Sequence, residues 1–266
     1  MNIEYLLARF VRKFTPESVV NFFLQKGIFI KPGLETSNPD EALSQYLSVL
    51  DKQGISIAGK KCLLFGYGGN FGLGCMLLEQ GATHVVLMDK YAHPNTQRNL
   101  ALLPRYEKYL EYTGKEVLPH SNNITLHHDD IQKLSTTIDI VLSSSVFEHV
   151  EDVEGVAQAL STLMNPQGVQ IHFIDLRDHF FKYPFEMLCY SEKTWYNWLN
   201  PSSYLNRYRM PDYQRVFETY FTNVEMTVLE RNMDAFQQVQ SRVRKEFLTG
   251  NNEIDSITSI LIVARN

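Results

Sequence analysis

The sequence predicts an α/β fold in which helices cover a mostly parallel sheet, and three observations lead to this prediction. Residues 62–65 form a short apolar run without polar interruption, as expected of a strand buried on both faces. Glycines are concentrated within residues 66–69, and a helical pattern follows over residues 72–80. A second apolar run at residues 83–88 ends on Asp89. The order of strand, glycine turn, helix and strand is that of one βαβ unit.

The glycine turn lies at the carboxyl end of the first strand, where open α/β sheets bind their ligands. Glycines let the backbone turn sharply and let a ligand approach the main chain closely. Amides at the start of the following helix can bind a polar or anionic group. Asp89 ends the second strand and can accept both hydrogen bonds of a ribose diol. We therefore expect a ligand-binding site at this edge of the sheet.

Residues 66–74, GYGGNFGLG, and residues 85–91, VVLMDKY, resemble the first two motifs of class I S-adenosylmethionine-dependent methyltransferases. The dinucleotide fingerprint G-x-G-x-x-G fits less well, because its third glycine position is Phe71 and Gly72 comes one residue later. One position departs from the methyltransferase pattern. Leu64 stands where such enzymes usually carry an acid that helps to hold the methionine part of the cofactor.

The resemblance implies a Rossmann-like, seven-stranded, mostly parallel sheet flanked by helices, with an antiparallel last pair of strands. One domain would cover residues 1–266. It would comprise N-terminal helices at 1–60, a cofactor-binding core at 61–174, an aromatic-rich helical cap over the substrate at 175–222, and closing strands at 223–266. The cap would be inserted after the fifth strand.

The remaining elements follow from hydrophobic periodicity, capping residues and helix breakers. Helices are expected at residues 3–14, 38–52, 95–112, 153–164 and 235–248, with the third kinked or split at Pro104. Strands are expected at residues 124–128, 138–143, 169–174, 224–229 and 257–264, with a turn at 165–168. Residues 22–30 form a further aromatic and apolar stretch.

The first predicted helix carries an apolar stripe along one face. We expect this stripe to pack on the domain, and the alternative is a basic amphipathic helix that lies on a membrane surface. The stripe consists of Ile3, Leu7, Phe10, Val11 and Phe14.

The resemblance also implies a set of cofactor-binding residues. An acid after the third strand is where these methyltransferases usually contact the adenine amino group, and Asp130 fits that position better than Asp129. The serines that end the fourth strand would lie beside the methyl donor. The full set is Gly66, Tyr67, Gly68, Asn70, Phe71, Asp89, Lys90, Asp130, Ile131, Ser144 and Ser145.

Residues 138–160, IDIVLSSSVFEHVEDVEGVAQAL, resemble the fourth-strand motif of the same family, including the Glu-His-Val that opens the next helix. His149 is a candidate catalytic base because an unperturbed imidazole titrates near neutral pH. In many relatives, however, the matching histidine is structural or merely close to the site. Both roles stay open for His149.

The segment after the fifth strand contains both tryptophans of the chain, Trp195 and Trp198, among many tyrosines and phenylalanines. Aromatic side chains with polar tips suit a concave site that buries an organic ligand, although they can equally form the core of the cap itself. The pattern D-x-R-D-H at residues 175–179 resembles bacterial methyltransferases that act on saccharides, lipids or secondary metabolites.

His179 is the predicted general base, because its imidazole can take a proton from a hydroxyl or ammonium group as the methyl group transfers. Asp178 or Asp175 would orient it. Arg207 is a candidate anchor for an anionic group of the substrate. The expected substrate-binding residues are Asp175, Arg177, Tyr183, Trp195 and Arg207.

Composition excludes several classes of function. The net charge of -5 provides no basic field for nucleic acid, and no apolar stretch reaches the length of a membrane span. The three cysteines lack metal-type spacing, so we expect reduced thiols, a cytoplasmic location and no metal site. The first residues also lack the small-residue cleavage site of a signal peptide.

The sequence therefore predicts an S-adenosylmethionine-dependent methyltransferase that acts on a small molecule in biosynthesis, such as a secondary metabolite, a saccharide or a lipid-like acceptor. O-methylation is favoured, followed by N- or C-methylation. A catalytically degenerate fold that serves as a binding or partner subunit is the first alternative, because of Leu64. An NAD-dependent oxidoreductase is the second, since Asp89 permits a ribose but the loop spacing argues against it.

Overall fold

The computed structural model describes residues 2–15, 34–180, 182–200 and 204–266. The apolar stretch at residues 22–30 lies outside this part of the chain. Among the described residues, no helix combines the length and the apolar character needed to cross a membrane.

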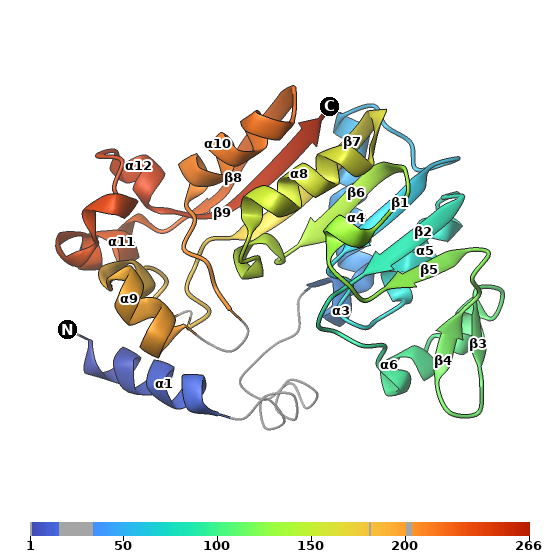
Figure 1. The fold of residues 1–266 in the computed structure, drawn as a ribbon, viewed down its shortest axis with the longest axis horizontal. Coiled ribbons are helices and arrows are strands. Elements are labelled where there is room, and N and C mark those ends of the chain that lie inside the picture. The colour runs from blue at the N-terminus through green and yellow to red at the C-terminus, as the bar shows by residue number, and fades with distance from the viewer. Residues whose placement is uncertain (1, 16–33, 181, 201–203) are drawn as a thin grey trace.

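A seven-stranded sheet forms the centre of the molecule, with the strand order β5-β2-β1-β6-β7-β9-β8 (Figure 1). The five strands from β5 to β7 are parallel, whereas β9 runs antiparallel to both β7 and β8. The predicted sheet is therefore confirmed, including its antiparallel end. The strands are β1 (Lys61–Phe65), β2 (His84–Met88), β5 (Ile124–His127), β6 (Ile138–Ser144), β7 (Met164–Asp175), β8 (Asn223–Arg231) and β9 (Ile257–Arg265).

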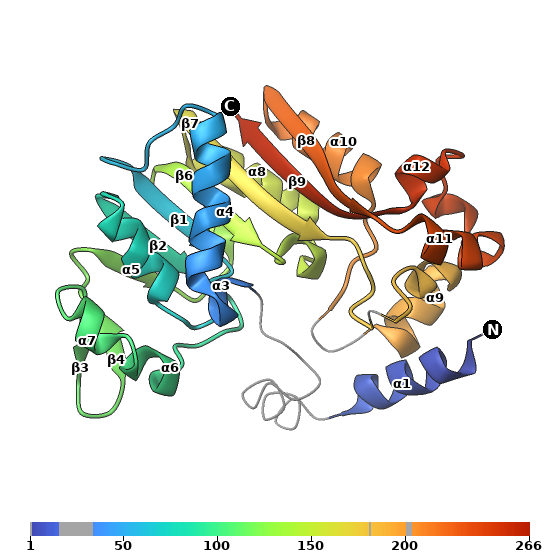
Figure 2. The same ribbon diagram turned by 180° about the vertical axis from the view of Figure 1, so that it is seen from behind.

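Helices cover both faces of the sheet, and each face has its own hydrophobic core (Figures 1 and 2). On one face lie α3 (Leu34–Ser37), α4 (Pro39–Lys52) and α5 (Gly72–Glu79); on the other lie α8 (Val153–Leu163) and α10 (Met210–Tyr220). Asn38 caps α4 by accepting the amide of Glu41 at 3.3 Å, as the sequence predicts. The sheet thus holds the carboxyl ends of its parallel strands in one rigid edge.

The stretch at residues 95–112 is only partly helical. It forms α6 (Thr96–Leu100) and α7 (Leu103–Tyr106), with Pro104 in the first turn of α7, so the predicted split is confirmed. Its last residues instead form β3 (Leu110–Tyr112), which pairs with β4 (Val117–Pro119). The buried side chain of Leu110 accounts for this, because pairing with β4 buries it while the next two side chains stay exposed.

Two other predicted elements have different ends. The predicted turn at residues 165–168 lies within the bounds of β7 (Met164–Asp175). The predicted helix at 235–248 is shorter, since α11 (Met233–Val239) is followed by separate turns of 3₁₀ helix. In the first of these turns, Arg242 makes two hydrogen bonds to the buried carboxylate of Glu186, at 2.6 and 2.8 Å. Arg242 and Glu186 are 56 residues apart in the sequence, so the hydrophobic periodicity of the helix cannot predict this ion pair.

Residues 185–199, Leu205 and residues 235–248 build a third hydrophobic cluster beside the sheet, which we call the cap core. Short helical turns form it, at Glu186–Cys189, Trp195–Leu199 and α11, with α9 (Glu192–Thr194) and α12 (Asn252–Asp255) next to them in Figure 1. The cap core contains Phe185, Met187, Leu188, Trp195, Leu199, Leu205, Phe236 and Val243. The aromatic residues of this segment therefore largely pack against one another. This agrees with the interpretation that they form the core of the cap itself.

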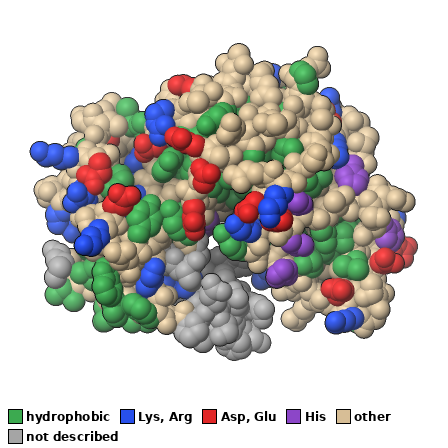
Figure 3. Space-filling model, viewed as in Figure 1, with side chains coloured by type: hydrophobic (Ala, Val, Ile, Leu, Met, Phe, Trp, Pro, Cys, Tyr) green, Lys and Arg blue, Asp and Glu red, His purple; other side chains and the backbone are tan. Residues whose placement is uncertain are grey.

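Helix α1 (Ile3–Phe14) lies against the cap through a face other than the predicted one (Figure 1). Tyr5 and Arg9 are buried and both bind the carboxylate of Asp178. The expectation that the apolar stripe packs on the domain was wrong, because its five side chains are 47–71% exposed. Figure 3 shows hydrophobic side chains along this helix at the surface. A buried carboxylate needs a charged partner, and this requirement sets the rotation of the helix.

Arg9→Ala should release α1 from the cap. The substitution leaves the buried Asp178 without its cation, a change that costs about 3–5 kcal/mol for a buried pair. We expect a lower free energy of unfolding in urea and faster trypsin cleavage near α1. Lys182→Ala is the control, because its ion pair with Glu4 is exposed and its loss should leave both measurements nearly unchanged. Equal behaviour of the two variants would contradict this account.

Candidate functional site

The glycine turn after β1 has no room for side chains at three positions. Gly66, Gly68 and Gly69 have φ angles of 89°, 63° and 78°, which favour glycine. A Cβ on Gly66 would lie 2.2 Å from Val146, and one on Gly68 would lie 2.1 Å from the hydroxyl of Thr36. The turn is therefore enclosed by the segment after β6 and by α3, and its main chain can come close to a ligand.

Asp89 bonds both to the glycine turn after β1 and to the residues that follow β2. One carboxylate oxygen accepts the amide of Gly68 at 3.1 Å. The other accepts the amides of Tyr91 and Ala92 at 2.9 and 2.8 Å. A carboxylate has about four acceptor positions, so these three bonds leave about one position for a hydroxyl group of a ligand. Asp89 thus braces the glycine turn and stays available as an acceptor.

The other predicted residues of the turn mainly shape it. Asn70 accepts the amide of Gly72 at 2.8 Å and donates to the carbonyl of Thr36 at 3.1 Å. The ring of Phe71 is buried and stacks on that of Tyr67 at 6.1 Å between centroids. Burial raises the pKa of Tyr67, whose hydroxyl has no hydrogen-bond partner among the described residues. We assign Asn70 and Phe71 to the support of the turn.

The predicted adenine side of the site lies after β2 and β5. Lys90 and Asp130 form an exposed ion pair of 2.6 Å that joins these two strand ends. Ile131 is buried next to them, and Asp129 pairs with Lys133 instead. The structure therefore brings Lys90, Asp130 and Ile131 together at the edge that also carries Asp89.

The serines at the end of β6 lie at the same edge. Ser143 is buried and bonded to His172 at 2.7 Å within the sheet, so it faces away from a ligand. Ser144 pairs with Phe173 of β7, and the amide of Ser145 donates to the Phe173 carbonyl at 2.9 Å. Ser145 has a φ of 54°, a left-handed conformation that reverses the chain toward the Glu-His-Val segment.

Glu148, His149 and His179 form a polar cluster, which we call the Glu-His-His cluster. The rings of His149 and His179 contact each other, with centroids 4.8 Å apart. Burial, reinforced by the neighbouring His149, lowers the pKa of His179 well below its ordinary value. Burial raises the pKa of Glu148 well above its usual range. The structure thus brings both predicted histidines together and adds a carboxylate that the sequence did not single out.

The two acids predicted to orient His179 have other partners. Asp175 makes paired hydrogen bonds to the guanidinium of Arg177, at 2.9 and 2.8 Å. Arg177 also lies 3.6 Å from Glu230. Asp178 is fully buried and accepts the amide of Phe180 at 2.8 Å in addition to its contacts with α1. Asp178 therefore attaches α1, and Asp175 and Arg177 remain at the end of β7 beside the cluster.

Three of the predicted substrate-binding residues do not lie at the carboxyl ends of the strands. Trp195 and Arg207 are buried in the cap, and Tyr183 contacts α1. Trp195 is fully buried, and its indole donates to the carbonyl of Leu205 at 3.1 Å. Arg207 is buried and donates to the carbonyl of Tyr190 at 2.7 Å. Tyr183 donates its hydroxyl to Glu4 of α1 at 2.7 Å. We assign these side chains to the structure of the cap.

Glu35 of α3 is a further site residue, and no motif in the sequence pointed to it. It is 3% exposed, and one of its carboxylate oxygens accepts the hydroxyl of Tyr46. The other oxygen is buried and has no hydrogen-bond partner in the described part of the chain. The next residue, Thr36, is the one that contacts the glycine turn. An acid close to the N-cap residue of a predicted helix, here Asn38 of α4, is a common pattern, so the sequence alone could not single out Glu35.

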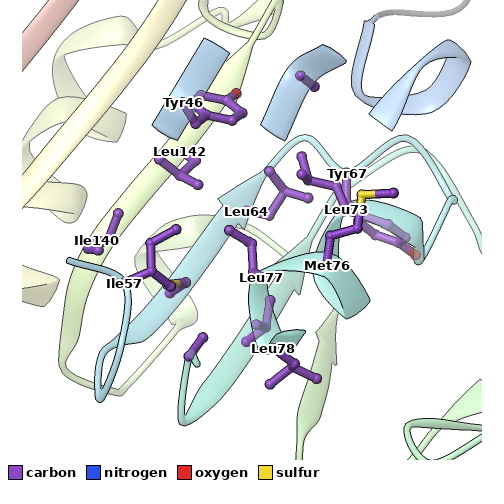
Figure 4. Close-up of a cluster of buried hydrophobic side chains, with 14 of the residues drawn as sticks. Tyr46, Ile57, Leu64, Tyr67, Leu73, Met76, Leu77, Leu78, Ile140 and Leu142 are labelled. Carbon is purple, nitrogen blue, oxygen red and sulfur yellow. The ribbon is translucent and has the colours of Figure 1, made fainter. Parts of the chain in front are cut away.

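Tyr46 and Leu64 belong to the same core, on the face of the sheet that α3 and α4 cover (Figure 4). Leu64 is fully buried among hydrophobic side chains, and Tyr46 contacts Phe173 of β7 with ring centroids 5.6 Å apart. Glu35 therefore places a carboxylate near the ends of β1 and β7 on the face where Leu64 provides none.

Comparison with known proteins identifies this arrangement. A family model described as a methyltransferase domain matches residues 40–230. The chain belongs to the methyltransferase domain family. The matched segment contains the glycine turn, Asp89 and the Glu-His-His cluster. The chain is a class I methyltransferase that uses S-adenosylmethionine as its methyl donor.

Solved methyltransferase structures share the fold. A chain from a complex of a Haloferax volcanii methyltransferase with its Trm112 activator has a TM-score of 0.51 at 14% identity, covering 87% of this chain and 92% of that one. A 1,6-didemethyltoxoflavin N1-methyltransferase from Burkholderia thailandensis has a TM-score of 0.50 at 12% identity, covering 100% and 91%. A geranyl diphosphate methyltransferase has a TM-score of 0.50 at 13% identity, covering 84% of both. A search of curated proteins finds no match.

The methyltransferase site fits its cofactor on the observed geometry. The glycine turn has no side chains at Gly66, Gly68 and Gly69 that could cover its main chain, and Asp89 accepts the amide of Gly68 within it. The unpartnered oxygen of Glu35 adds a second acceptor at the same edge. These features suit a ligand with a ribose and a cationic end.

Asp89→Ala should weaken binding of S-adenosylhomocysteine about 10- to 100-fold, because a hydrogen bond to a charged acceptor contributes about 1.5–3 kcal/mol. Isothermal titration calorimetry measures the effect. Asp51→Ala is the matched control, since this exposed acid lies at the far end of α4. Unchanged affinity in a folded Asp89→Ala variant would remove Asp89 from the cofactor site.

Proposed function

We propose that the protein methylates a hydroxyl group of a small organic acceptor, such as a secondary metabolite, a saccharide or a lipid-like molecule. The observation that carries this proposal is the position of the Glu-His-His cluster, at the ends of β6 and β7 and directly beyond the serines next to the glycine turn. S-adenosylmethionine supplies an electrophilic methyl group on a sulfonium. The S–C bond breaks as the O–C bond forms, and S-adenosylhomocysteine leaves.

Each end of the cofactor has a defined group of protein partners in this proposal. The glycine turn and Asp89 hold the ribose, while Lys90, Asp130 and Ile131 border the adenine. Ser144 and Ser145 flank the reacting methyl group. Asp89 and Asp130 follow the ends of the neighbouring strands β2 and β5, so the pairing of these strands brings the ribose and adenine sides to the same edge.

Glu35 takes over the role of the acid that Leu64 lacks. S-adenosylmethionine carries an ammonium group at its methionine end, and a buried carboxylate with an unpartnered oxygen is a strong acceptor for it. The hydroxyl of Tyr46 holds the other oxygen of Glu35 and so orients the carboxylate. An acid from α3 replaces one from β1, because both positions border the same face of the sheet.

Proton removal from the acceptor is assigned to the Glu-His-His cluster. Burial lowers the pKa of His179, so its imidazole is neutral at physiological pH and its lone pair can accept a hydrogen bond from the acceptor hydroxyl or bind a cation. The enzyme's main contribution is then alignment of the acceptor with the methyl group, supported by polar groups at the reacting atom. Asp175 and Arg177 form the nearby charged pair that an acceptor would meet.

Titration with S-adenosylhomocysteine tests the proposed function first. We expect binding in the micromolar range or tighter, and no heat of binding with NAD. Absence of S-adenosylhomocysteine binding in a folded sample would instead favour a partner subunit with a degenerate site. Acceptor screening with labelled S-adenosylmethionine then separates O-methylation from N- and C-methylation.

Glu35→Gln should weaken S-adenosylhomocysteine about tenfold or more but leave the affinity for 5′-methylthioadenosine unchanged. The second ligand has the adenosine part and lacks the amino-acid end, so the comparison isolates the ammonium contact. Asp89→Ala is the matched control, because it should weaken both ligands. Equal weakening of both ligands by Glu35→Gln would show that Glu35 only supports the fold of the turn.

The pH dependence of binding should report the same contact. Burial raises the pKa of Glu35 well above its ordinary value, so the ligand-free carboxyl is protonated at higher pH than usual. An ammonium group prefers the ionised carboxylate, so affinity for S-adenosylhomocysteine should rise as the pH rises through this raised pKa. The Glu35→Gln variant should lack that rise.

His179→Ala should lower turnover about 100-fold or more while cofactor affinity stays the same, since groups that assist proton transfer typically contribute this much. Single-turnover assays with an accepted substrate and calorimetry with S-adenosylhomocysteine give the two values. His120→Ala, in the segment after β4, is the control. Wild-type turnover of His179→Ala would exclude His179 from the reaction.

A further inference from the structure

The Glu-His-His cluster has the composition and spacing of a metal-binding site. Glu148 and His149 lie on the 3₁₀ turn after β6, Phe147–His149, and His179 follows β7. One potential ligand atom from each side chain lies within 4.8 Å of those of the other two. A metal ion holds such atoms at about 2.0–2.2 Å from itself, which places them about 3–4 Å apart. Small side-chain rotations close the remaining difference.

His149 is oriented as metal-binding histidines usually are. Its Nδ1 lies 2.6 Å from the carbonyl oxygen of Tyr204. Because a carbonyl oxygen only accepts, Nδ1 carries the proton, and the lone pair of the neutral ring lies on Nε2. A backbone carbonyl bound to the other ring nitrogen is the common support of a metal-ligating histidine. Tyr204 has a φ of 47°, so the chain adopts an unfavourable backbone conformation where it presents this carbonyl.

Glu148 is the second, independent indication. Its side chain is 3% exposed. The side chain of Ser145 and the backbone of Glu148 and Asp175 lie near its carboxylate, but among the described residues neither carboxylate oxygen has a hydrogen bond of normal geometry. Burying a carboxylate without a partner is costly, and coordination of a cation offsets this cost. The amide of Asn206 bonds to the Glu148 carbonyl, and its side chain bonds to that of Phe147 at 2.7 Å, so the turn is held in place from the cap.

We infer that Glu148, His149 and His179 bind one divalent transition-metal ion. Two imidazoles and one carboxylate form a ligand set that suits Zn²⁺, Mn²⁺ or Fe²⁺, whereas Mg²⁺ and Ca²⁺ prefer oxygen ligands alone. Three protein ligands leave at least one coordination position open. The sequence had indicated no metal, because the ligands come from two segments separated in the chain.

The site also has a consequence for catalysis, and this part rests on the proposed function. An acceptor hydroxyl that occupies the open position has its pKa lowered by the cation, as bound water does. The proton would leave to solvent, the acceptor oxygen would form a bond to the methyl carbon as the S–C bond breaks, and S-adenosylhomocysteine would leave. His179 acts as a ligand in this scheme, rather than as the free base that the sequence suggested.

Calorimetric titration of chelator-treated protein with Zn²⁺ tests the site without any activity measurement. We expect one tight equivalent in the wild type, and affinity reduced at least about tenfold in Glu148→Gln, His149→Gln and His179→Ala. His128→Ala is the matched control, because the rings of His128 and His93 also contact each other, at 5.4 Å between centroids, without a carboxylate of this kind. Circular dichroism confirms that each variant is folded.

The outcomes separate the two proposals. Equal Zn²⁺ affinity in the wild type and all three ligand variants, or no binding by folded wild type, would overturn the metal site. Loss of turnover in EDTA that Zn²⁺ or Mn²⁺ restores supports its catalytic role, and full turnover in EDTA contradicts that role. Binding of S-adenosylhomocysteine is measured separately, so a failed metal site leaves the methyltransferase proposal intact.

Discussion

The structure depends on the close packing around the glycine turn after β1. Side-chain positions on Gly66 and Gly68 are already occupied by Val146 and Thr36, which come from opposite sides of the turn. The turn therefore links the two segments that carry Glu148 and Glu35. A methyl group at either glycine would push apart the elements that place the polar side chains. One steric constraint thus connects the fold of the βαβ unit to the geometry of the whole site.

Buried charges organise the cap in a second way. Arg9 and Tyr5 of α1 meet at Asp178, only one residue before His179. Arg242 and Glu186 form a comparable pair farther along the cap. These pairs contribute little net stability once desolvation is counted, but a wrong arrangement would leave a charge unpaired. They therefore specify how α1 and the cap lie against the ends of the strands.

Much of the site was predictable because it is encoded locally. The glycine turn, Asp89, Asp130 and the end of β6 each follow an apolar run, and parallel strands bring their carboxyl ends to one edge. Once the strands were recognised, these residues had to be neighbours. Trp195 and Arg207 are buried within the cap, and the sequence does not show this because aromatic and basic residues in a segment carry no information about which of them face inward.

The sequence by itself determined the order of the strands, the glycine turn and the acids at the strand ends, because periodicity and steric limits act over a few residues. Only the tertiary structure decided that Glu35 lies next to the residue that contacts the glycine turn, which face of α1 is buried, and that Glu148, His149 and His179 converge. These features depend on pairing between segments far apart in the chain. Glu35 lies next to Thr36, which contacts the turn because α3 packs there, and His179 meets His149 because β6 and β7 are adjacent.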